Sequence, residues 1–224
     1  MELQQKNMRQ FWALLFFGCS MFSSCAQKQS EVHTTKQETQ EVAFQDGDII
    51  FQTSNSSQSK AIQLATQSVY SHMGIIYQID GEWMVYEAIQ PVQLTALSTW
   101  IARGKEQHYV VKRLRQSEEV LTPSAIAKMK AFGEGFHGKA YDIYFEWSDE
   151  RIYCSELVWK IYKHATGIEI GQLEELKDFD LSSKAVQDKM QERYGSNIPM
   201  NEKVISPAAI FQSPLLLTVA PAQN

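Results

Sequence analysis

Three side chains in this sequence are of the types that together perform nucleophilic catalysis: a cysteine, a histidine and a glutamate. Cys154 is the one cysteine found after position 25. A thiolate nucleophile requires a nearby general base, usually a histidine, and that base needs a further group to orient it. His72 and Glu87 are the candidates for these two roles, because a predicted hairpin places both on one face.

The segment around Cys154, RIYCSELVWKIYKHATG (151–167), predicts a helix that ends at Gly167. Apolar residues recur along it at the helical spacing that marks a buried stripe, and Cys154 begins that stripe. They are Leu157, Val158, Ile161, Tyr162 and Ala165. Taken alone, this pattern favours simple packing of a free cysteine. However, Cys154 also falls in the first turn, where free N–H groups stabilise a thiolate or an oxyanion.

The hairpin follows from an Asp-Gly pair at 80–81, which separates two alternating apolar segments and predicts a two-residue turn. In that register Gly74 lies opposite Glu87, and His72 is a diagonal neighbour of Glu87 on the same face, about 7–8 Å away at the backbone. A three-residue loop would reverse this arrangement. A half-solvated sheet would instead let Glu87 point to water.

The remaining histidines are poorer candidates for the base. His164 lies on the same predicted helix as Cys154, about 15 Å along its axis. His33 falls in a polar N-terminal segment, and His108 and His137 occupy positions where a surface side chain is the default. His72 is therefore the predicted base.

The elements needed to position these residues mix strands and helices, which predicts an α+β fold. The predicted strands lie within residues 45–52, 71–79, 82–89 and 108–114. The predicted helices lie within residues 54–68, 97–104, 122–136, 151–167 and 182–195. The C-terminal tail contains Pro207 and Pro214, and we expect it to wrap the surface.

The N-terminus is typical of an exported lipoprotein. Residues 1–24 combine Lys and Arg with a short apolar run, the pattern of a signal peptide. Cys25 follows two serines and is the predicted lipidation residue, with Cys19 as a weaker alternative and an ordinary signal peptide as another. Residues 25–43 are predicted to form a polar tether and residues 44–224 the folded domain. We expect the domain to be held by its lipid in the bacterial cell envelope, facing the periplasm.

Composition excludes several other functions. The chain has 224 residues, 44% of them hydrophobic, which suffices for one domain with a core. Its formal net charge is -5 and it has no run of Lys or Arg, so we expect no nucleic-acid partner. The histidines and cysteines show no ligand spacing, so we predict no metal and no cofactor.

An ordered set of motifs resembles the YiiX-like family of permuted papain-like cysteine hydrolases. The motifs are GDIIF, SHMGIIY, YEA, GKAYDIYFEW and IYCSELVWKIY, in that order. In the related NlpC-type peptidases the cysteine helix precedes both the strand with the Gly-Asp pair (GDIIF) and the strand with the histidine (SHMGIIY). Here the cysteine helix follows both strands. The resemblance implies a circularly permuted papain-like or NlpC-type fold, with an antiparallel sheet or small barrel packed against helices.

The resemblance also implies a catalytic triad of Cys154 as nucleophile, His72 as base and Glu87 as the third polar residue. Tyr141, in GKAYD, resembles the tyrosine that precedes the nucleophile helix in NlpC-type enzymes. Tyr141 and Ser155 are thus candidates for contacting the substrate or the oxyanion, with core packing as the alternative for Tyr141.

Three functions are compatible with these features. The first is an amidase or peptidase that cleaves a peptide or cell-wall amide through an acyl-enzyme on Cys154. The second is a lipid-directed acyltransferase or thioesterase that uses the same triad on an acyl substrate. The third is a non-catalytic binding lipoprotein in which Cys154 is only packed, and an unreactive thiol would distinguish it.

Overall fold

The structure of the protein, a computed structural model, describes residues 43–221. The predicted signal peptide (1–24), the lipidation candidate Cys25 and all of the predicted tether except Ala43 lie outside the described residues, as does His33. Across the described part of the chain, no helix is both long and apolar enough to cross a membrane.

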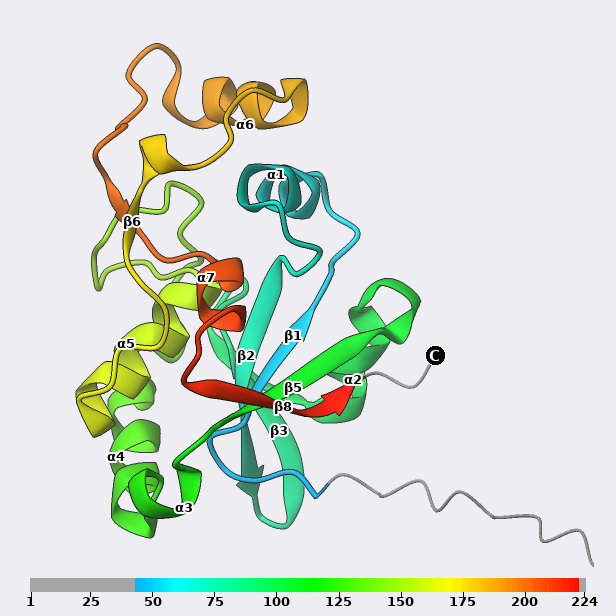
Figure 1. The fold of residues 1–224 in the computed structure, drawn as a ribbon, viewed down its shortest axis with the longest axis vertical. Helices are drawn as coiled ribbons and strands as arrows, with labels where there is room; N and C mark the ends of the chain where they lie inside the picture. Colours follow the sequence, from blue (N-terminus) through cyan, green and yellow to red (C-terminus); the bar gives the residue numbers. More distant parts are fainter. Residues whose placement is uncertain (1–42, 222–224) are drawn as a thin grey trace, which may run out of the picture. The chain divides into compact units, whose positions relative to one another are not determined.

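The centre of the fold is an open, antiparallel six-stranded sheet (Figure 1). In spatial order its strands are β4 (Gln93–Ala96), β3 (Glu82–Glu87), β2 (His72–Ile79), β1 (Ile49–Gln52), β5 (Tyr109–Leu114) and β8 (Leu216–Pro221). β4 and β8 do not pair with each other, so the sheet is not closed into a barrel. A separate small ladder joins β6 (Glu174–Glu175) to β7 (Lys203–Val204).

Helices pack on both faces of this sheet. They are α1 (Ser57–Thr66), α2 (Leu97–Arg103), α3 (Ser117–Val120), α4 (Pro123–Glu134), α5 (Cys154–Thr166), α6 (Lys184–Tyr194) and α7 (Pro207–Phe211). Strand residues alternate between the faces. Ile75 of β2 lies in the core beneath α4 and α5, whereas Ile76 packs in a second cluster with Trp100 of α2. The fold is therefore α+β, as the sequence predicts.

The helix of Cys154 follows its predicted pattern closely. Its apolar stripe is in the core, with Leu157, Val158 and Ile161 all 0% exposed. The helix ends at Gly167, which has the left-handed backbone (φ 76°) that glycine adopts without strain. Cys154 is its first residue, so the prediction that it lies in the first turn is confirmed.

The helices α1 and α6 pack against each other at the end of the sheet where β2 begins (Figure 1). A small apolar cluster joins them, formed by Ala61 of α1, Val186 and Met190 of α6, and Leu176. Residues of α1 line the hollow that His72 also lines, and α6 packs on α1.

The C-terminal tail does not wrap the surface, so that prediction was wrong. Residues 207–211 form α7, whose Ile210 is 0% exposed. Residues 216–221 form β8, an edge strand paired antiparallel with β5. Pro207 is the first residue of α7, and Pro214 lies shortly before β8. The missing backbone N–H of proline is tolerated at both positions. Burial of Ile210 and Leu216 makes the tail part of the core.

Candidate active site

His72 and Glu87 meet as the predicted hairpin register requires. Asp80 and Gly81 form a two-residue turn, and Ile79 pairs with Glu82 at its base. At the far end of the hairpin, the side chains of His72 and Glu87 are joined by a 2.6 Å hydrogen bond between Nε2 and Oε2. The His72 side chain is 13% exposed and that of Glu87 is 0% exposed. The alternative of a solvated Glu87 is thereby excluded.

Gly74 provides the space for this contact. A Cβ at that position would lie 2.5 Å from a Val85 methyl carbon, 2.8 Å from the Tyr86 carbonyl oxygen and 3.3 Å from the Cβ of Glu87. Real carbon atoms do not approach that closely, so any side chain at position 74 would displace β3. Glycine at 74 therefore allows the strand carrying Glu87 to come near enough to reach His72.

Three further side chains donate hydrogen bonds to the Glu87 carboxylate, and sequence reasoning missed them all. Thr95 Oγ1 donates to Oε1 at 2.5 Å, Trp100 Nε1 donates to Oε2 at 2.9 Å, and Arg103 Nη2 also donates to Oε1. The indole ring of Trp100 stacks on the His72 imidazole, with centroids 5.8 Å apart. The carboxylate is thus fully engaged and holds the ring in one orientation.

These contacts control the charges of the pair. Burial by itself would raise the pKa of Glu87, but the hydrogen bonds from His72 and Thr95 and the charges of His72 and Arg103 lower it overall. Burial opposes protonation of His72, yet hydrogen bonds to Cys154 and Glu87, with their charges, raise its pKa from 6.5 to about 9. The site therefore favours an imidazolium beside the ionised Glu87 carboxylate.

Cys154 also interacts with the imidazole. Its thiol lies close enough to His72 to raise the pKa of the ring, while Nε2 of that ring is bound to Glu87. The thiol is free of disulfides and 2% exposed. The structure thus brings together the three residues predicted for the triad, in the linear order cysteine, histidine, carboxylate.

Tyr141 is also close to Cys154. Its backbone forms a bridge with Ile152, just before α5, and the Cys154 side chain lies near enough to raise the pKa of its phenol. Burial, followed by the negative charge of Cys154, raises the pKa of Tyr141, so the phenol stays protonated and can donate. Gln58 of α1 donates from Nε2 to the Tyr141 oxygen at 3.1 Å. Gln58 was not predicted, because an isolated glutamine on a short polar helix carries no distinctive signal.

The start of α5 is fixed by the backbone of a single residue from the C-terminal region, Ile205. The N–H of Ile205 donates to the Tyr153 hydroxyl at 3.1 Å, and its carbonyl accepts from the Ser155 hydroxyl at 2.7 Å. Ile205 therefore holds the residues on both sides of Cys154. Because the Ser155 hydroxyl is used in this way, any contribution of Ser155 to an oxyanion site would come from its backbone N–H.

A buried carboxyl group lies beneath the same helix start. Glu156 is 0% exposed, and it accepts from the backbone N–H of Tyr153 at 3.5 Å. Lys160 Nζ lies 2.8 Å from its Oε1. Burial raises the pKa of Glu156 to about 8 in spite of the hydrogen bond from Lys160. Through the Tyr153 N–H, Glu156 holds the first turn of α5.

Among the described residues, the other histidines lie away from Cys154. His164 stacks on Phe132, with centroids 3.9 Å apart, and His108 stacks on Tyr70 at 6.5 Å. His137 is exposed. The choice of His72 as the base is the one consistent with this geometry.

Comparison with known proteins agrees with the motif order and the fold. A family model described as "Permuted papain-like amidase enzyme, YaeF/YiiX, C92 family" matches residues 43–220. The chain belongs to this family. It is 51% identical over 176 residues to the "Uncharacterized protein YiiX" of Escherichia coli (strain K12), covering 79% of this chain and 86% of that protein.

A solved relative has the same fold. The crystal structure of "metalloprotein yiiX" from Escherichia coli O157:H7 superimposes with a TM-score of 0.77 at 49% sequence identity, covering 80% of this chain and 98% of that one. The permuted papain-like fold predicted from the motifs is therefore confirmed for this member of the family.

Proposed function

We propose that this protein hydrolyses an amide bond through an acyl-enzyme on Cys154. The observation that carries the proposal is the cluster of Cys154, His72 and Glu87 at the start of a helix. His72 is hydrogen-bonded to Glu87, and Cys154 lies close enough to His72 to raise its pKa. Membership of a permuted papain-like amidase family supports the same reaction class. In this assignment Cys154 is the nucleophile, His72 is the base and acid, and Glu87 is a positioning residue.

In the first half of the reaction the thiolate of Cys154 attacks the amide carbonyl carbon and forms a carbon–sulfur bond. The carbonyl oxygen becomes an oxyanion, which the unpaired backbone N–H of Cys154 at the helix start can stabilise. Tyr141 and Gln58 offer side-chain donors beside it. The intermediate then collapses, the carbon–nitrogen bond breaks, and the amine leaves with the proton that His72 held.

In the second half a water molecule attacks the thioester carbon while neutral His72 removes one of its protons. The second oxyanion uses the same donors. Its collapse breaks the carbon–sulfur bond, releases the carboxylic acid and returns Cys154 to the thiolate beside a protonated His72. Glu87 holds the imidazole through its hydrogen bond to Nε2 in both halves.

The test is amide hydrolysis by the purified protein compared with a Cys154→Ala variant, over a set of acylated amines and peptides. Trapping an acyl group on Cys154 and detecting it by mass spectrometry would identify the intermediate. Iodoacetamide should modify Cys154 readily at neutral pH, because catalytic thiolates react fast. Equal product formation by both proteins, or an inert thiol, would refute the proposal and favour a binding role.

The description of the E. coli relative as a metalloprotein raises the question of a metal in this chain. Over residues 43–221 no three His, Cys, Asp or Glu side chains cluster closely enough to hold one. The Glu87 carboxylate accepts hydrogen bonds from four side chains and is not free to bind a metal. Cys154 and His72 would then supply two protein ligands, fewer than a zinc site uses. These residues do not fit a metal centre. We expect EDTA to leave amide hydrolysis unchanged. A loss of activity in EDTA that one added metal reverses would contradict this.

We also propose that the protein is exported and anchored by a lipid on Cys25. The support is the order of positive, apolar and small residues that ends in Ser-Ser-Cys. Labelling of cells with a fatty-acid analogue should mark the wild-type protein and not a Cys25→Ser variant. Equal label on both would refute lipidation at this residue.

A further inference from the structure

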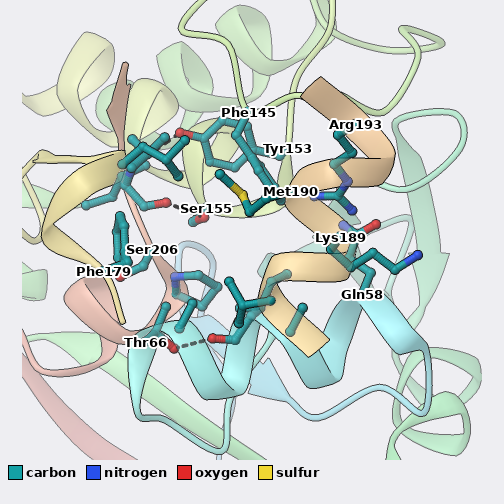
Figure 2. A pocket seen from close by; sticks show the side chains of 18 of the residues that line it. Gln58, Thr66, Phe145, Tyr153, Ser155, Phe179, Lys189, Met190, Arg193 and Ser206 are labelled. Carbon is teal, nitrogen blue, oxygen red and sulfur yellow. Dashed lines mark hydrogen bonds between the residues drawn. The ribbon is translucent and has the colours of Figure 1, made fainter. Parts of the chain in front are cut away.

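A polar hollow lies on the His72 side of the reaction centre. It contains about 700 Å³ of empty space, including its open mouth. Gln58 of α1 lines this hollow and also the apolar cavity beside Cys154, which Figure 2 shows. His72 lines the polar hollow but not that cavity, so the hollow opens at the base of the triad. Its polar side chains include Gln52, Ser54, Ser56, Ser59, His72 and Arg103.

Gln52 and His72 are neighbours across the sheet. Gln52 is the last residue of β1 and lies directly opposite His72, the first residue of β2. Side chains at opposite positions of an antiparallel pair share one face of the sheet, with Cβ atoms about 4.5–5.5 Å apart. The Gln52 side chain therefore stands beside the imidazole.

The side-chain oxygen of Gln52 has no hydrogen-bond partner among residues 43–221, although Gln52 is only 2% exposed. Buried polar groups in folded proteins are nearly always hydrogen-bonded, so an exception needs an explanation. This oxygen lies against Gly104, where an added Cβ would collide with it. The NH₂ group of the same amide is thus the part that a ligand in the hollow can reach, and it donates to an acceptor such as a carboxylate oxygen.

Arg103 brings a guanidinium group to the same place. Its Nη2 donates to Oε1 of Glu87, while Oε2 of that carboxylate is bound to Nε2 of His72. The guanidinium and the imidazole are therefore neighbours on one carboxylate. The Arg103 side chain is 39% exposed, and Glu87 is its one ion-pair partner in the described part of the chain. A guanidinium has five N–H donors, so Arg103 keeps donors for a ligand in the hollow.

The wall of the hollow is positively charged. Arg103 is a cation, and the pKa of His72 is raised to about 9, so its ring is protonated at neutral pH. Among the described residues, no Asp or Glu side chain lines the hollow. Glu87, which balances part of this charge, is 0% exposed and lies beneath the wall. A cleft lined by charges of one sign attracts a ligand of the opposite sign, so the expected occupant is an anionic group.

The chemistry decides which part of an amide lies in this hollow. His72 gives its proton to the departing nitrogen, so that nitrogen has to lie within roughly 2.6–3.2 Å of the imidazole. The amine half of the amide therefore occupies the polar hollow. The planar fork of an arginine matches a carboxylate. Because Gln52 and Arg103 both adjoin the imidazole, that carboxylate has to lie close to the departing nitrogen.

We propose that the amine half of the substrate carries a carboxylate close to its nitrogen, as an amino acid does, and that Arg103 and Gln52 bind this carboxylate in the polar hollow. This inference rests on the proposed function, because it assumes that His72 protonates a departing amine. The acyl carbon bonds to Sγ of Cys154 as its bond to nitrogen breaks, and the amino acid leaves with the proton from His72. Water then hydrolyses the thioester. The substrate class is thus an N-acyl amino acid, which includes a peptide at its C-terminal bond.

The test compares amides that share one acyl group and differ in the amine. N-hexanoylglycine carries the carboxylate, and N-hexanoylglycinamide is its neutral counterpart of nearly the same shape. We expect kcat/KM to be roughly 10- to 100-fold higher for the acid, the range of a hydrogen bond to a charged group. This advantage should shrink for the conjugates of β-alanine and 6-aminohexanoate, in which the carboxylate lies further from the nitrogen. Faster hydrolysis of a phosphonate analogue of the glycine conjugate would overturn the choice of a carboxylate.

Substitution of Arg103 locates the carboxylate. Arg103 also supports Glu87, so Arg103→Gln should slow both substrates, and the ratio of their kcat/KM values cancels that shared loss. This acid-to-amide ratio should fall to near 1 in Arg103→Gln and keep its wild-type value in Lys105→Gln. Lys105 is exposed and does not line the hollow, so it controls for the loss of one positive charge nearby. Gln52→Leu should lower the ratio by roughly 2- to 10-fold.

Binding to the Cys154→Ala protein supplies a readout that needs no turnover. Titration calorimetry should show tighter binding of N-hexanoylglycine than of N-hexanoylglycinamide. Adding Arg103→Gln to the same protein should remove the difference, because the carboxylate then loses its cationic partner.

The outcomes separate this inference from the proposed function. Equal kcat/KM for the acid and the amide in the wild type would overturn the carboxylate assignment while leaving the amidase intact. A wild-type ratio in Arg103→Gln would place the carboxylate elsewhere and refute the inference. No hydrolysis of any amide, with selective binding of the acid by Cys154→Ala, would overturn the amidase and keep the anion site.

Discussion

Replacing Glu87 by glutamine changes one charge at nearly constant shape, so it isolates what the carboxylate does for His72. Glu87 accepts from His72, Thr95, Trp100 and Arg103. A glutamine has one acceptor oxygen, and its NH₂ group would face donors. The rise in the pKa of His72 from 6.5 to about 9 corresponds to roughly 3 kcal/mol in favour of the protonated ring. Interactions with Cys154 and with Glu87 both contribute to this rise in the pKa of His72.

We therefore expect the pKa of His72 to fall substantially in Glu87→Gln. The active ion pair needs a protonated imidazole, so wild-type kcat/KM should decline as the pH rises through about 9. In the variant this alkaline decline should begin at lower pH. The maximal rate should fall by up to ~10⁴-fold, because a misoriented histidine cannot transfer protons correctly.

The assay is a pH profile of kcat/KM for amide hydrolysis, with Glu82→Gln as the matched control. Glu82 lies on the same strand but is exposed. The control should keep both the rate and the position of the alkaline limb. An unchanged alkaline limb in Glu87→Gln would show that the carboxylate does not sustain the imidazolium, and the role assigned to Glu87 would be refuted.

Three other substitutions test separate parts of the site. Gly74→Ala should lower the free energy of unfolding by about 1–3 kcal/mol and reduce kcat, because the new Cβ would lie 2.5 Å from Val85. Denaturant titration measures the free energy of unfolding. A variant with wild-type stability and activity would contradict the role of Gly74. Gln58→Leu should reduce kcat by about 10²–10³-fold if its amide serves the oxyanion, and a change confined to KM would argue against that role. Glu156 keeps its proton to about pH 8 in the folded state but loses it near 4.5 when unfolded, so wild-type stability should decrease across that interval, by at most about 5 kcal/mol. Glu156→Gln should remove this decrease, and parallel pH–stability curves for the two proteins would refute the assignment.

The parts of the site that follow from local chemistry could be predicted from the sequence. An Asp-Gly turn sets the hairpin register, and the register alone places His72 within reach of Glu87. The apolar spacing of α5 likewise identifies Cys154 as the first residue of a buried stripe. That Cys154 meets His72 is a contact between distant segments, for which the ordered family motifs, rather than any local pattern, provided the link.

The parts that depend on distant pairing could not be predicted. Thr95 reaches Glu87 because β4 pairs with β3, and Arg103 reaches it from the end of α2. Neither residue belongs to a pattern that indicates a role. The tail was expected on the surface because of Pro207 and Pro214. Its burial depends on β8 pairing with β5, which is remote in the sequence.

The two backbone hydrogen bonds of Ile205 have a consequence for the order in which the site assembles. His72, Glu87 and Cys154 all precede Ile205 in the sequence, and it is the Ile205 backbone that holds both neighbours of Cys154. A nascent chain that stops short of Ile205 thus carries every reacting side chain but lacks the contact that fixes the nucleophile. A segment remote from the triad in the sequence therefore has to fold onto α5 before the start of that helix is held.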